Sequence, residues 1–266
     1  MFDACPKCGC TPLPKQQEFP AACPACGLVL AKFKAAAARK DFDIALQFAD
    51  AEPATAAGAG GFAGRITGLL FYLPQQVARL NWQGRCAALL VFSLWTIWIF
   101  KDYDITGDPG SRFLHLALTP FHEAGHYLIF RWFGQFIMIL GGTLGQHLMP
   151  IVLGIALLLQ RRDPFGAALL FWLLGFSVAD MGIYMYDAFD PQLMLLDGRT
   201  GAESDGHDWQ NILGDLGLLK RAHAIGRFSG WLGKGMMLAC LAWAAWLLWL
   251  QRARLSDSLF AEDGHE

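Results

Sequence analysis

Long apolar segments separated by short polar ones make up most of the chain after residue 80. Five of them are candidate membrane spans: residues 86–100, 113–133, 134–160, 165–189 and 235–250. A helix needs about 20 mostly apolar residues to cross a bilayer, and Trp82 and Tyr103 can extend the short first segment as interface anchors. The pattern predicts an all-α polytopic membrane protein with about 4–5 transmembrane helices.

The direction of the spans is left open by the sequence. Five spans counted from a cytoplasmic N-terminus place Arg161-Arg162 and Arg252/Arg254 outside, against the positive-inside rule. Glycines and Pro150 interrupt residues 134–160, and broken backbone is tolerated at membrane depth where it lines a cavity. A re-entrant segment there is the alternative, and it returns both arginine clusters to the cytoplasm.

Composition agrees with a membrane protein. Hydrophobic residues make up 55% of the 266 positions and charged residues 17%, whereas a soluble domain has about a quarter charged residues. The net charge of −2 gives no electrostatic reason to expect a nucleic-acid partner. No secretory signal peptide opens the chain. We expect a protein integral to a membrane, with the bacterial inner (cytoplasmic) membrane as its location.

The first 30 residues form a separate cysteine module. Two C-P-x-C-G knuckles, Cys5–Cys8 and Cys23–Cys26, are separated by 14 residues, close to zinc-ribbon spacing. Four thiolates fill a zinc shell, so the ion is structural. The alternative is a pair of disulfides, which requires an oxidising compartment. A reduced four-thiolate site predicts that the N-terminus lies in the cytoplasm. We expect the ribbon to bind a cytoplasmic partner, whose identity is unknown.

The remaining segments follow from composition. Residues 31–61 read as a helix and a flexible Gly/Ala-rich linker, and residues 62–81 as an interfacial amphipathic segment. The membrane-embedded domain extends over 82–254, and 255–266 is a polar C-terminal tail.

The chemistry concentrates in His122-Glu123-Ala124-Gly125-His126, an H-E-x-x-H sequence inside an apolar segment. Histidines at i and i+4 share one helix face, so both imidazoles can bind one Zn²⁺. The adjacent Glu123 is the candidate general base for a zinc-activated water. Charged groups in an apolar segment are costly and usually functional. Chance occurrence of so short a motif is the competing interpretation.

A catalytic zinc needs a third protein ligand. Asp187 is one candidate, since Asp180, Tyr184 and Asp187 share one face of the fourth apolar segment. The alternatives are His207, Asp180 and Asp197. His207 stands in Gly-His-Asp-Trp, where it also reads as a loop histidine before a short helix capped by Asp208.

Three segments in this order resemble the site-2 protease family of intramembrane zinc metalloproteases (peptidase family M50). Residues 121–126 are similar to the family's H-E-x-G-H helix, residues 141–150 to its G-P-x-x-N segment with Gln146 where Asn is usual, and residues 180–188 to its N-x-x-P-x-x-x-L-D-G segment. The last match lacks the Asn, the Pro and the final Gly. The resemblance implies a three-helix core that hydrolyses peptide bonds in membrane protein substrates, with Asp187 as third ligand.

The predicted function is therefore a membrane-embedded zinc metalloprotease with one catalytic and one structural Zn²⁺. Gln146 and His147 are the candidate substrate-binding residues. Two alternatives remain: a non-proteolytic zinc-dependent membrane hydrolase, and a metal-binding regulatory membrane protein, which would have no need of Glu123.

Overall fold

The computed structural model describes residues 61–107, 113–204 and 206–256, and in the N-terminal part residues 2, 4, 5, 7, 8, 10–14 and 21–30. The chain divides into two compact units, Met1–Gly60 and Gly61–Glu266. The helix and linker expected over 31–60, and the tail after residue 256, lie outside the described residues.

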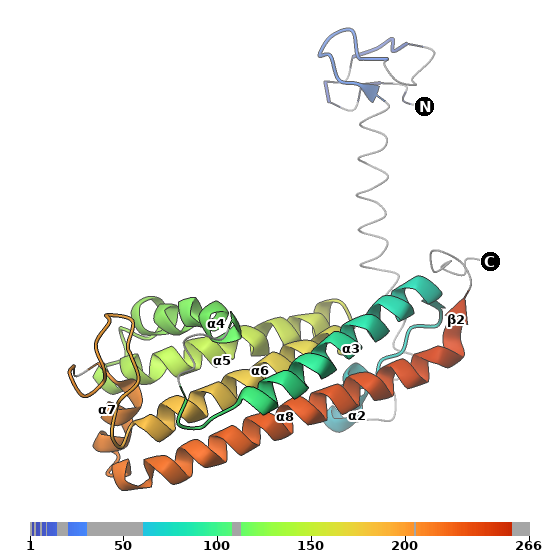
Figure 1. Cartoon of the computed structure of the whole chain (residues 1–266). Helices are drawn as coiled ribbons and strands as arrows, with labels where there is room; N and C mark the ends of the chain where they lie inside the picture. Colours follow the sequence, from blue (N-terminus) through green and yellow to red (C-terminus); the bar gives the residue numbers. More distant parts are fainter. Residues whose placement is uncertain are drawn as a thin grey trace. The chain divides into compact units, whose positions relative to one another are not determined.

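Four long helices dominate the second unit: α3 (Arg79–Asp102), α5 (Gln135–Gln160), α6 (Pro164–Asp187) and α8 (Ala222–Gln251). They lie side by side as a bundle (Figure 1). In the described part of the chain, these four are long and apolar enough to cross a membrane. The prediction of a helical membrane protein with about 4–5 spans is confirmed, with four candidate spans in the described residues.

The segment with H-E-x-x-H is not one of these spans. It forms a short α-helix, α4 (Phe113–Ala124), which continues as a π-helical turn, η2 (Gly125–Ile129). Conversely, residues 135–160 are not broken: α5 continues through its glycines and Pro150. The glycines serve close packing instead, because a Cβ on Gly145 would overlap the Phe121 carbonyl oxygen of α4. The re-entrant alternative is therefore wrong for this segment.

Short elements tie the bundle together at one end. Helix α2 (Phe62–Leu70) precedes β1 (Val77–Ala78), and β1 pairs in parallel with β2 (Leu255–Ser256), which follows the turn η4 (Arg252–Arg254). The start of the first candidate span and the end of the last therefore lie together. Within the segment predicted to be interfacial, α2 forms a helix.

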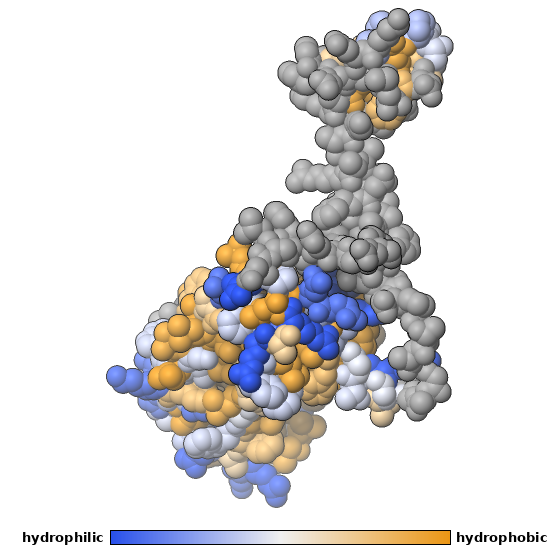
Figure 2. Space-filling view, turned by 90° about the vertical axis from the view of Figure 1, so that its right-hand side faces the viewer, coloured by the Kyte–Doolittle hydropathy of each residue, from blue (hydrophilic) through white to orange (hydrophobic). Residues whose placement is uncertain are grey.

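Both arginine clusters lie at this same end. The Arg254 guanidinium donates to the carbonyl oxygens of Leu73 and Pro74, and that of Arg162 lies 5.6 Å from the ring centre of Tyr72. Figure 2, which looks at this side of the molecule, shows hydrophilic residues gathered between hydrophobic ones. Counted from a cytoplasmic N-terminus, four spans put both arginine clusters on the cytoplasmic side, whereas five spans would put both outside.

Helix α6 is the centre of the packing. It runs antiparallel to α8 along a seam of small residues, where Gly182 meets Gly226 and Gly230. Small residues allow helices in a membrane to approach closely. Next to the seam, the fully buried Trp172 of α6 donates its indole N–H to Thr96 of α3, at 2.8 Å.

The outer surface of the bundle is apolar. On α3, Leu90, Leu94, Ile97 and Trp98 are all more than half exposed. A soluble monomer rarely exposes such a continuous apolar face. The surface fits a lipid environment, and the lengths of the helices fit a bilayer.

Candidate metal centre

His122 lies in the last turn of α4 and His126 one turn further, in η2. Their imidazoles meet edge to face, with the two Nε2 atoms 3.1 Å apart. π-Helical turns are frequent at functional sites. The sequence prediction that both histidines present their rings to one point agrees with this geometry.

Asp208 completes the group. It is the first residue of α7 (Asp208–Asp215), and its Oδ2 lies 3.0 Å from His122 Nε2 and 3.1 Å from His126 Nε2. Three ligands at about 2.05 Å from a tetrahedral Zn²⁺ are separated by roughly 3.3 Å. The triangle of Nε2, Nε2 and Oδ2 therefore has nearly the size that a zinc ion requires.

A second contact determines which nitrogen of His126 faces this triangle. His126 Nδ1 lies 2.8 Å from the backbone carbonyl oxygen of Met138, so Nδ1 carries the proton and donates it. In the neutral ring, Nε2 then has a lone pair directed at His122 Nε2 and Asp208 Oδ2. Histidine ligands of metals usually donate their other ring N–H in this way.

Asp208 is suited to remain ionised. Burial disfavours its charged form, but the contacts with the imidazoles of His122 and His126 outweigh burial and lower the pKa of Asp208 below its usual value. Its position in the first turn of α7 places the carboxylate at the positive end of that helix.

Helix α5 forms the wall behind the two rings. Gly142 faces the histidines so closely that a Cβ there would overlap both Nε2 atoms. A Cβ on Gly125 would likewise overlap the carbonyl oxygen of Gly141. The glycines of both elements thus bring η2 and α5 close enough for the imidazoles to lie between them.

Glu123 lies beside the triangle without joining it. Its side chain is half-buried, and within the described residues it makes no hydrogen bond or ion pair. It interacts electrostatically with His126 and with Tyr184 of α6. A carboxylate with no hydrogen-bonding or ion-pair partner next to a metal triangle is what a general base requires.

The group lies near one end of the bundle, opposite the end where β1 and β2 pair (Figure 1). Gly142 is seven residues from the start of α5, and Tyr184 three residues from the end of α6. At 1.5 Å per residue, the metal triangle lies within about 10 Å of these helix ends.

The structure places the predicted third ligands elsewhere. Asp187 accepts backbone N–H bonds from Gln192 and Leu193, and Asp197 pairs with Arg199 in an exposed loop. Asp180, buried in α6, lies 2.7 Å from Nδ1 of His115. None of these carboxylates joins His122 and His126, and the assignment of Asp187 is replaced by Asp208.

His207 is also not at the triangle. Its side chain is fully buried, and its Nδ1 accepts the backbone N–H of Gln210, so His207 is the N-cap of α7. The sequence predicted that Asp208, the next residue, would be the N-cap of this short helix. Because the cap falls one residue earlier, Asp208 is free to turn toward the histidines.

The two candidate substrate-binding residues lie on α5, just after the glycines. The Nε2 atoms of Gln146 and His147 are buried and have no hydrogen-bond partner among the described residues. His147 is close enough to His122 to interact with it electrostatically. The Gln146 amide is therefore available as a donor, and His147 Nε2 as an acceptor because the other ring nitrogen bonds to the Ser177 backbone.

The four cysteines of the N-terminal unit form a second group. The Sγ atoms of Cys5 and Cys26 are 3.7 Å apart, as are those of Cys8 and Cys23, and all four lie within 4.8 Å of one another. A tetrahedral zinc with Zn–S bonds of about 2.3 Å separates its sulfurs by roughly 3.8 Å. All four are free thiols, so the predicted alternative of two disulfides is not what the structure shows.

Backbone geometry supports the second knuckle. Gly27 has φ +70°, and its N–H donates to the Cys23 carbonyl. Burial raises the pKa of the Cys23 thiol, but the backbone N–H groups of Cys26 and Ala25 outweigh burial and lower it to about 6, while the pKa of the contacting Cys8 thiol is raised to about 12. A thiol that ionises so easily is suited to bind a metal.

Comparison with protein-family models, with curated proteins and with solved structures finds no match to this chain. The resemblance to site-2 proteases therefore rests on the sequence motifs quoted above, and the activity is argued from the geometry of the site.

Proposed function

We propose that this protein is a membrane-embedded zinc metalloprotease in which His122, His126 and Asp208 hold the metal and Glu123 is the general base. The observation that carries the proposal is the triangle of ligand atoms at 3.0–3.1 Å, with the Glu123 carboxylate beside it, which has no hydrogen-bond or ion-pair partner within the described residues. Three protein ligands leave a fourth position for water, as in catalytic zinc sites.

Charge also favours zinc over a purely hydrogen-bonded cluster. Asp208 and Glu123 bring two negative charges into a largely apolar surrounding, where isolated charges are costly. A divalent cation bound by two neutral histidines balances both carboxylates.

The chemistry divides between metal and protein. Zinc, when bound, polarises water and a carbonyl oxygen so that water attacks at neutral pH. Glu123 takes the proton of the attacking water and delivers it to the leaving amine. Among the described residues the Gln146 side-chain amide is unpaired, and it donates to a backbone carbonyl of an extended substrate. His147 bonds to the Ser177 backbone through its other nitrogen, so its Nε2 accepts a substrate backbone N–H.

The surroundings of the site favour a membrane protein as substrate. The surface next to the histidines is apolar and exposed: Phe121, Tyr127 and Leu128 of α4 and η2 have exposed fractions of 41%, 62% and 76%. A hydrophobic segment can approach along this face from the lipid. Because a helix hides its carbonyls in its own hydrogen bonds, the substrate must unwind locally at the site.

The N-terminal cysteines are proposed to hold a structural zinc, which makes two zinc ions per chain. We propose that this unit lies in the cytoplasm, where thiols stay reduced, and binds a cytoplasmic partner there. The arginines at the end where the chain enters the bundle support the same orientation under the positive-inside rule.

The experiment compares Glu123→Gln with the natural protein, reconstituted with membrane protein substrates. Since Glu123 is not a ligand, the variant should keep its metal, and its turnover should fall about 10²- to 10⁴-fold. Asp208→Ala should instead lose the metal of the bundle. If Glu123→Gln cleaves as fast as the natural protein, the hydrolase proposal fails. If neither cleaves any membrane protein but only the natural protein hydrolyses a small ester or amide, the substrate is not a protein.

A further inference from the structure

The last two turns of α6 hold the segment that carries Asp208. Three α6 side chains contact it: the Trp209 indole N–H points at Met181 Sδ, 2.9 Å away, and Tyr184 and Asp187 contact residues 207 and 208. Tyr184 and Asp187 are three residues apart and so lie on one face of the helix.

His207 is the residue through which Asp187 acts. It is fully buried, and its Nδ1 accepts the backbone N–H of Gln210, so the neutral ring carries its proton on Nε2. That Nε2 lies 3.2 Å from Asp187 Oδ2, close enough for an ion-pair contact, although the pair does not have hydrogen-bond geometry. The ring is therefore held by a backbone hydrogen bond at one nitrogen and faces the Asp187 carboxylate with the other, directly beside the proposed metal ligand.

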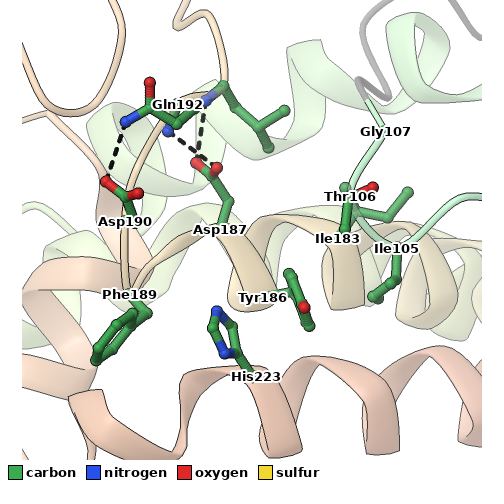
Figure 3. A pocket seen from close by; sticks show the side chains of 11 residues that line it. Ile105, Thr106, Gly107, Ile183, Tyr186, Asp187, Phe189, Asp190, Gln192 and His223 are labelled. Carbon is green, nitrogen blue, oxygen red and sulfur yellow. Dashed lines mark hydrogen bonds between the residues drawn. The ribbon is translucent and has the colours of Figure 1, made fainter.

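Asp187 also fixes the other end of the same loop. Its two carboxylate oxygens accept the backbone N–H groups of Gln192, at 2.9 Å, and Leu193, at 3.1 Å. Figure 3 shows this carboxylate turned toward Gln192, on the wall of a cavity of about 370 Å³. One side chain thus joins the beginning of the loop to its end.

Tyr184 reaches the ligand itself. Its ring packs against that of His207 at a tilt of 39° with centroids 4.1 Å apart, and its hydroxyl oxygen accepts the backbone N–H of Asp208 at 3.1 Å. The backbone of the third ligand is therefore held by a side chain of a rigid, membrane-spanning helix.

We propose that Tyr184 and Asp187, acting through His207, are positioning residues that hold Asp208 against the metal. A ligand supplied by a loop is bound tightly only if the loop is ordered before the metal arrives, because ordering it on binding costs conformational entropy. This inference rests on the proposed metal centre and not on its hydrolytic activity.

The test measures Co²⁺ affinity of the full-length protein by competition with a chromophoric chelator. All proteins carry Cys8→Ser and Cys26→Ser, so that the bundle is the only predicted site. Tyr184→Phe and Asp187→Ala should each weaken Co²⁺ binding about 10- to 100-fold, as is usual for residues supporting a ligand. The visible absorption of the bound Co²⁺ should also change as the carboxylate detaches.

Two neighbours serve as matched controls. Tyr186→Phe alters the next tyrosine of the helix, whose hydroxyl contacts only Arg227 among the residues that the structure describes. Asp190→Ala removes a carboxylate bonded to the Gln192 side chain. Both should leave Co²⁺ affinity within about twofold, because neither contacts the segment of Asp208.

The outcomes separate this inference from the proposed function. If Asp208→Ala weakens Co²⁺ binding while Tyr184→Phe and Asp187→Ala bind as the natural protein does, the positioning role is overturned and the metal centre stands. If thermal stability falls in the two variants and Co²⁺ affinity and absorption do not change, the residues are merely structural, which also overturns it. Loss of affinity in Tyr184→Phe, a variant that keeps the ring packed against His207, supports it most directly.

Discussion

At the metal centre, one hydrogen bond decides the chemistry of a residue. Because the His126 Nδ1–H is donated to the Met138 carbonyl, the His126 Nε2 lone pair is directed at a carboxylate oxygen 3.1 Å away. Two electron pairs at that distance repel unless a cation lies between them. A single proton can join only one pair of the three atoms, whereas a metal ion satisfies all of them.

Gly142 is the position at which an added side chain would disturb the two histidine rings most directly. A Cβ at this position would overlap the Nε2 atoms of both histidines. In Gly142→Ala the ring tips must move while the backbone stays, so we expect metal affinity to fall by at least about tenfold with little change in stability.

Gly84→Ala is the control for this variant, because a Cβ on Gly84 of α3 meets no atom within 4 Å. Chelator competition on both proteins checks the prediction. Equal affinity in the two would mean that the rings are not held against α5.

At the scale of elements, the packing of α6 against α8 depends on small residues. A Cβ on Gly182 would lie 2.7 Å from the backbone atoms Gly226 O and Gly230 N, which cannot turn away as a side chain can. Gly182→Ala should therefore force the two helices apart and destabilise the protein by about 1–3 kcal/mol.

Thermal unfolding in detergent measures this effect. The same exchange at Gly84 should not destabilise, since alanine is the better helix former by up to about 1 kcal/mol. A melting temperature of Gly182→Ala equal to that of the natural protein would contradict the close seam.

For the whole molecule, labelling of thiols tests orientation and the ribbon together, in a Cys86→Ala, Cys240→Ala background. With the N-terminal unit in the cytoplasm, a membrane-impermeant maleimide should label no cysteine in sealed cells. In opened cells it should label Cys10, a free thiol outside the four-cysteine group. A strong chelator should then expose four more thiols, because zinc protects its ligands.

Labelling of sealed cells from outside would reverse the orientation. Five thiols labelled in opened cells without chelator would instead show that the four cysteines hold no metal. The two results are independent of each other, and neither depends on the catalytic site.

Much of the molecule could be predicted from sequence because the signals were local. Apolar length predicted the membrane helices, the i, i+4 spacing brought His122 and His126 to one face, and the paired knuckles brought four cysteines together. Each depends on residues within a turn or a short loop, so the periodicity of the backbone settles the geometry.

The third ligand could not be found in this way, because Asp208 is 82 residues from His126 and the two meet only through packing. The sequence placed Asp187 on the face of α6 that lies near the site, but the first turn of α7 puts a different carboxylate, Asp208, beside His122 and His126. The length of α4 and the continuity of α5 were likewise decided by tertiary contacts, since the glycines that looked like breaks are the surface on which η2 packs. Local pattern determined which groups are available; the packing of distant helices decided which of them meet.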